Sequence, residues 1–99
     1  MTQFIIERDI PGASMLTSEE LAAIAAKSND VVASLSVPYT WVRSYVAGDK
    51  FYCVHETSDM EAVWEHAQRG GFPANTVAEI TAVIGPETAE TATKATTTE

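Results

Sequence analysis

Residues 39–57 read YTWVRSYVAGDKFYCVHET, and this stretch decides the fold. The runs 39–46 and 50–56 are rich in aromatic and β-branched residues, which are typical of strands. Residues 47–49 (AGD) lie between the two runs and form a turn-prone connection. The stretch therefore predicts a β-hairpin in the middle of the chain.

A helix is predicted on each side of this hairpin. The first is expected to begin after Thr17, which can form a capping box with Glu20, and to stop before Pro38. The second is expected to begin after Ser58 and to be closed by the glycines at 70–71. Apolar residues recur at helical spacing in both segments, namely Leu21, Ile24, Val31 and Leu35 in the first and Met60, Val63, Trp64 and Ala67 in the second.

Strands are predicted at both ends of this arrangement. Residues 4–8 form a short β-branched run, and residues 76–84 alternate in polarity. The order is βαββαβ, and right-handed crossovers then give an antiparallel four-stranded sheet in the spatial order 4-1-3-2. This is a ferredoxin-like α+β fold with both helices on one face. We assign it to residues 1–86, and residues 87–99, mostly Thr, Ala and Glu, are expected to form a disordered tail.

Composition narrows the possible partners. The chain has 99 residues, enough for one domain, and a formal net charge of -8. Such a charge argues against nucleic acid and anionic membrane surfaces as partners. No apolar run approaches the length of a membrane span, and residues 1–4 lack the basic start of a signal peptide, so a cytoplasmic location is expected.

The turn at 48–49 predicts which side chains share a face of the sheet. On the helix-covered side, Ser44 would lie opposite Cys53 and Val42 opposite His55. The open side would carry charge and aromatic rings together, and only two helices are available to cover the sheet. We therefore expect a homodimer that covers this face, which comprises Ile5, Glu7, Trp41, Arg43, Tyr45, Tyr52, Glu56, Glu79 and Thr81.

The residues that could carry chemistry permit two interpretations each. Cys53 is read as a buried apolar spacer, with a metal ligand or nucleophile as the alternative. His55 lies near the sheet margin and His66 off the apolar stripe of its helix, so either can be an ordinary hydrogen-bonded histidine or a ligand. Glu7 could act as an acid or base with Tyr45 and Tyr52 if burial raised its pKa. The alternative for Glu7 is an ion pair with Arg43 or Arg8.

Several short segments resemble a family of small bacterial proteins, classed as a domain of unknown function, that includes a nickel-binding, nickel-responsive member. The resemblance covers roughly residues 3 to 86 and is carried by residues 6–9 (IERD), 41–46 (WVRSYV), 52–54 (YCV), 65–67 (EHA) and 70–74 (GGFPA). It implies a ferredoxin-like dimer that binds nickel through His, Glu and Asp side chains. The candidate ligands are then His66, His55, Glu65 and Glu56, of which His66 is expected to reach the surface.

Two functions remain open from the sequence. The first is a protein that binds nickel or a similar divalent cation for sequestration or homeostasis. The second is a small cofactor-free enzyme that acts on a hydrophobic or aromatic metabolite in a dimer cavity, with Glu7, Tyr45 and Tyr52 as its catalytic residues.

Overall fold

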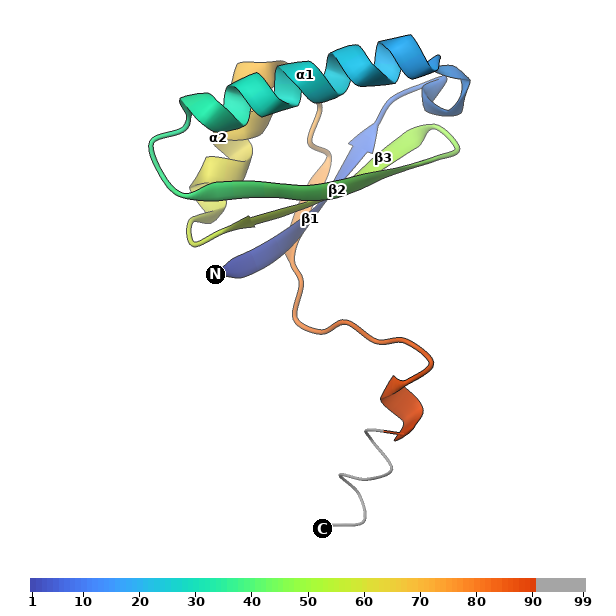
Figure 1. Ribbon diagram of the computed structural model, residues 1–99, viewed down its shortest axis with the longest axis vertical. Helices are drawn as coiled ribbons and strands as arrows, with labels where there is room; N and C mark the ends of the chain where they lie inside the picture. The colour runs from blue at the N-terminus through green and yellow to red at the C-terminus, as the bar shows by residue number, and fades with distance from the viewer. Residues whose placement is uncertain (91–99) are drawn as a thin grey trace.

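The computed structural model describes residues 1–90 and confirms the predicted fold. The strands form one antiparallel sheet in the order β2-β3-β1-β4, which is the predicted order read from the other edge. Figure 1 shows α1 running across the sheet beside α2, and the chain after β4 leading away from it. The elements are β1 (Thr2–Asp9), η1 (Ala13–Met15), α1 (Ser18–Ser34), β2 (Tyr39–Ala47), β3 (Lys50–Thr57), α2 (Met60–Gly70) and β4 (Thr76–Glu79).

The ends of these elements follow the local sequence closely. Thr17 and Glu20 form the predicted capping box, with the Thr17 hydroxyl accepting from the Glu20 amide at 3.1 Å. The cap of α2 is Asp59 instead of the predicted Ser58, and its carboxylate accepts from the Glu61 amide at 2.9 Å. Strand β4 ends at Glu79, earlier than predicted. The predicted tail at 87–99 stays a prediction, and its residues 91–99 lie outside the described part of the chain.

The hairpin turn has the predicted register, but a bulge interrupts β2. Ser44 lies opposite Cys53 as expected, whereas an irregularity between Trp41 and Arg43 places Trp41 opposite His55. A bulge adds one residue to a strand and so reverses which face the following side chains occupy. The prediction that Trp41 lies on the open face is therefore wrong: its indole is on the helix-covered side, where Nε1 donates to Ser44 Oγ at 3.0 Å.

The buried face of α2 also differs from the prediction. Val63 and Ala67 are buried as expected, but Trp64 is 46% exposed and His66 only 1% exposed. The inward stripe is thus rotated by roughly one residue, so that the helix directs an imidazole into the domain. Within residues 1–90, no helix is long and apolar enough to cross a membrane.

Candidate functional site

A cavity of about 250 Å³ lies between the two helices and the sheet. Its deep wall comes from β1, β3 and α2, whose lining side chains Arg8, Phe51, Cys53, His55 and His66 are all buried. Its outer wall comes from α1 and β2, whose lining residues Ile24, Ala25, Trp41 and Val46 are partly or largely exposed. The cavity therefore reaches from the surface between α1 and the edge strand β2 into the centre of the domain.

Two histidines meet at the deep wall. The rings of His55 and His66 lie edge to face with centroids 4.7 Å apart, and each residue is 1% exposed. The Tyr39 hydroxyl hydrogen-bonds His55 Nδ1, and the Tyr39 ring stacks on His66. The Ser28 hydroxyl of α1 lies 3.0 Å from His66 Nε2. Among the buried side-chain nitrogen and oxygen atoms of residues 1–90, only His66 Nδ1 has no hydrogen-bond partner.

Burial keeps both imidazoles neutral. Loss of hydration, together with smaller contributions from the nearby His66 and Arg8, lowers the pKa of His55 to about 3. Burial and the charge of Arg8 lower the pKa of His66 to about 4. Burial also raises the pKa of the Tyr39 phenol well above its ordinary value. At neutral pH these three side chains are therefore uncharged hydrogen-bonding groups, and each neutral imidazole has one nitrogen that donates and one that accepts.

Arg8 is the charged residue of the cavity. It is 3% exposed, its Nε donates to Cys53 Sγ at 3.3 Å, and its Nη1 donates to the Pro73 carbonyl at 2.7 Å. The guanidinium lies 5.5 Å from the centroid of the Phe72 ring. The sequence predicted for Arg8 only a role as an ion-pair partner of Glu7. Its period-two spacing from the apolar residues Phe4 and Ile6 was the signal that placed it on the covered face.

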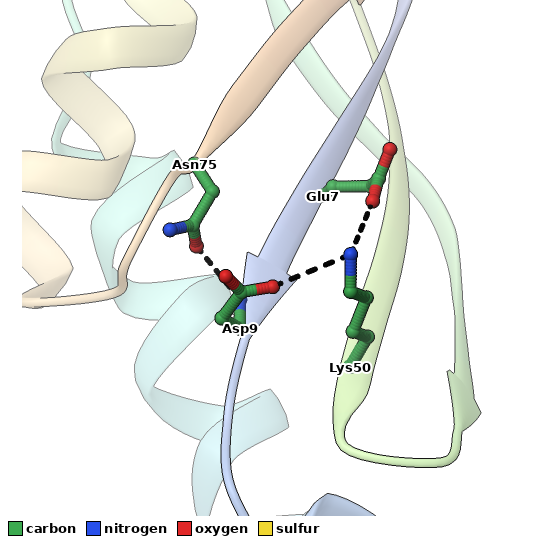
Figure 2. A network of polar contacts seen from close by, with 4 residues as sticks. All are labelled: Glu7, Asp9, Lys50 and Asn75. Atoms are coloured by element: carbon green, nitrogen blue, oxygen red, sulfur yellow. Dashed lines mark hydrogen bonds and ion pairs between the residues drawn. The ribbon is translucent and has the colours of Figure 1, made fainter.

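The proposed acid–base residues lie together, but on the other face of the sheet. Glu7 is opposite Tyr52 in the β1–β3 register, and Tyr52 is opposite Tyr45 in the β2–β3 register. The Glu7 carboxylate accepts from Lys50 Nζ at 2.8 Å, and Lys50 also contacts Asp9 at 3.5 Å (Figure 2). The predicted ion pair of Glu7 with Arg43 or Arg8 is therefore wrong, because its partner is Lys50.

Lys50 also changes the expected chemistry of Glu7. Its hydrogen bond and charge lower the pKa of the Glu7 carboxyl, the opposite of the rise that an acid–base role would require. A carboxylate with a lowered pKa is a weaker base. Asp9 is held in the same network because its amide donates to Asn75 Oδ1 at 2.7 Å, which ties β1 to the segment before β4 (Figure 2). These contacts form a surface ion network, separate from the cavity.

Comparison with known proteins identifies the family. The family model described as nickel responsive protein SCO4226-like matches residues 4–80. This chain belongs to that family. The crystal structure of SCO4226 from Streptomyces coelicolor A3(2) has a TM-score of 0.69 to this SCO4226-like chain at 20% sequence identity, covering 83% of this chain and 99% of that one. The likeness shows a shared fold. A search of curated protein sequences finds no match.

The predicted metal ligands of this SCO4226-like chain do not gather at one place. His55 and His66 meet in the cavity, whereas Glu65 pairs with Arg69 on the outer side of α2 and Glu56 lies on the open face of the sheet. Within residues 1–90, no three His, Cys, Asp or Glu side chains are arranged to hold a metal ion. The expectation that His66 reaches the surface is wrong, because the rotated α2 buries its ring.

Proposed function

We propose that this chain binds nickel as the cargo of a nickel response, through the imidazoles of His66 and His55. The observation that carries the proposal is Nδ1 of His66, a buried ring nitrogen without a hydrogen-bond partner in residues 1–90, which lies beside a second neutral imidazole. Nickel binds well to imidazole nitrogen, and the imidazole must be deprotonated to act as a ligand. The SCO4226-like family, named for nickel response, supports the same cargo.

The rest of the coordination sphere would come from outside this histidine pair. Cys53 is less available because Arg8 Nε already donates to its sulfur. Water, or side chains of a second copy of the chain, would complete the site. Glu65 and Glu56 are the remaining candidates from the sequence, and they would serve only a nickel ion bound at the surface.

Nickel titration of matched variants tests this assignment. We expect His66→Gln to weaken nickel binding by about tenfold or more, because it removes the proposed imidazole ligand, and Glu65→Gln to leave it nearly unchanged. Isothermal titration calorimetry gives both affinities, with circular dichroism as the check of folding. A loss caused by Glu65→Gln instead would place nickel at the surface, and absence of measurable binding to the wild type would refute the function.

The pH dependence of nickel affinity is a second test of whether the buried histidines are the ligands. If the ligand were an exposed imidazole with a pKa of about 6.5, nickel affinity would fall by about tenfold on acidification from neutral pH to about pH 5.5. Because burial lowers the pKa of His66 to about 4, we expect little loss over the same range. A tenfold loss would show that the nickel ligands are solvated.

The apolar cavity is compatible with the alternative function, a cofactor-free enzyme for a hydrophobic metabolite, but with other residues than those predicted. The cavity lies within one protomer, between the sheet and the helices, instead of between two protomers. Glu7, Tyr45 and Tyr52 do not line it. An enzyme of this kind would therefore use the cavity residues, and a catalytic role for those three would require chemistry on the open face.

Self-association through the open face stays a prediction, as does a cytoplasmic location. Tyr45 is 55% exposed and Ile5 37% exposed on this face, so a partner surface could bury both. We expect light scattering at micromolar concentration to give a dimer mass, and Tyr45→Glu to shift the protein to monomer because it would bury a charge. A wild-type monomer mass would contradict the prediction.

A further inference from the structure

We propose that the cavity binds a small apolar monocarboxylate, with Arg8 as the group that holds the carboxylate. The proposal does not rest on nickel binding, although His55 and His66 line the same cavity. The proposal joins three observations: a buried guanidinium without a counter-ion in the described part of the chain, an apolar and aromatic cavity beside it, and a route to solvent between α1 and β2.

The charge of Arg8 is not compensated by any carboxylate of residues 1–90. The acidic residues that form ion pairs within residues 1–90 do so with Lys50 and Arg69, and no carboxylate pairs with Arg8. Its two acceptors, the Cys53 sulfur and the Pro73 carbonyl, are neutral. A buried charge without an opposite charge is costly. Burying an anion beside Arg8 would offset that cost, which gives the cavity a preference for negatively charged ligands.

The guanidinium still has donors to offer. Arginine carries five N–H groups, and the two hydrogen bonds of Arg8 occupy one at Nε and one at Nη1. Nη2 makes no hydrogen bond to any residue in the described part of the chain. The donors left at Nη1 and Nη2 match the two oxygens of a carboxylate, the geometry in which arginine binds it most strongly.

The other cavity walls select the body of the ligand. Trp41, Phe51 and Phe72 supply aromatic surface, and Leu21 and Ile24 supply aliphatic surface. A dry cavity of about 150 Å³ accepts a benzene ring. The present volume of about 250 Å³ therefore has room for one aromatic ring and a carboxylate.

The charge count favours a monoanion over a phosphate. No acidic residue and no lysine lines the cavity, so Arg8 is its one charged lining residue in the structure of residues 1–90. Lys27 approaches only the Phe72 ring, 5.6 Å from its centroid. A single guanidinium balances one carboxylate, whereas a phosphate dianion would remain half uncompensated.

Tryptophan fluorescence can measure this binding directly. Trp41 lines the cavity and Trp64 is exposed on the outer side of α2, so Trp64→Phe leaves one reporter tryptophan at the site. The probes are benzoate and phenylacetate, each compared with its neutral amide, benzamide and phenylacetamide. We expect saturable quenching by the carboxylates and about tenfold or more weaker binding of the amides, as a charged hydrogen bond predicts.

Two substitutions on α1 test where the probes bind. Ala25→Phe fills the cavity from its outer wall, while Ala23→Phe places the same ring on an exposed position of the same helix. We expect the first to reduce carboxylate affinity by about tenfold and the second to change it less than about twofold. Both variants keep the buried residues intact, so they remain informative even if Arg8 variants do not fold.

Arg8→Met tests the charge itself. If the variant folds, carboxylate and amide should bind with equal affinity. Three results would overturn the proposal: no saturable binding of either carboxylate at millimolar concentration, equal affinity for carboxylate and amide in the wild-type cavity, or binding that Ala25→Phe leaves unchanged.

Discussion

The free energy of unfolding is expected to fall by several kcal/mol between about pH 6.5 and about pH 4.5, because His55 and His66 are buried as neutral rings. In the unfolded chain both histidines titrate near pH 6.5. In the folded protein the pKa is about 3 for His55 and about 4 for His66. Within this window the unfolded chain binds two more protons than the folded one, so acid favours unfolding.

The size of the effect follows from proton linkage. Each histidine contributes a slope of up to about 1.4 kcal/mol per pH unit, with full stability above about pH 6.5 and progressive loss as the pH falls toward the folded pKa. Urea unfolding at half-unit pH steps measures this slope. We expect His66→Gln to reduce it by about half, since one of the two linked protons is removed. A stability that is flat over this window would mean that the rings are hydrated in the folded state.

Replacing Ile6 by alanine should cost about 2–5 kcal/mol of unfolding free energy, whereas Ile5→Ala should cost less than about 1 kcal/mol. The two residues are neighbours in β1 with identical side chains. Ile6 is 0% exposed at the centre of the core, and Ile5 is 37% exposed on the open face. The difference therefore reports burial alone, because strand propensity is the same for both.

Denaturant unfolding of the two variants at neutral pH gives both costs. Equal losses would indicate that the open face is also buried in solution, as it would be in a tight dimer. Comparing the two losses at several protein concentrations distinguishes this case, because dimer stability depends on concentration and monomer stability does not.

The candidate site buries charged and polar groups, which costs free energy of folding that a small domain can rarely spare. A guanidinium, a thiol and two imidazoles occupy the side of the sheet where a domain of this size would gain most from apolar packing. Arg8, His55 and His66 are each at most 3% exposed, and His66 Nδ1 has no hydrogen-bond partner within residues 1–90. Natural sequences accept such departures from a simple apolar core at functional sites. The burial of these polar groups is the physical reason for assigning both nickel and the carboxylate to this cavity instead of to the open face.

Sequence alone determined the elements and their order. The capping box of Thr17 and Glu20 involves residues three apart, and the turn at Gly48 adopts a φ of 59° that glycine permits. The hairpin turn also fixed the pairing of Ser44 with Cys53. Interactions between near neighbours in the chain carry these features, so the local residue types suffice to predict them.

Only the tertiary structure decided the site. The bulge that moves Trp41 across the sheet has no local signal in β2, and the rotation that buries His66 is accompanied by contacts with Ser28 and Tyr39, far away in the chain. Arg8 is held in the cavity by hydrogen bonds to Cys53 and Pro73, which are 45 and 65 residues away in sequence. A helix stripe or a strand face can shift by one residue at little local cost. The packing of distant side chains then selects which position faces the core. The sequence pattern of a single helix or strand does not determine that position.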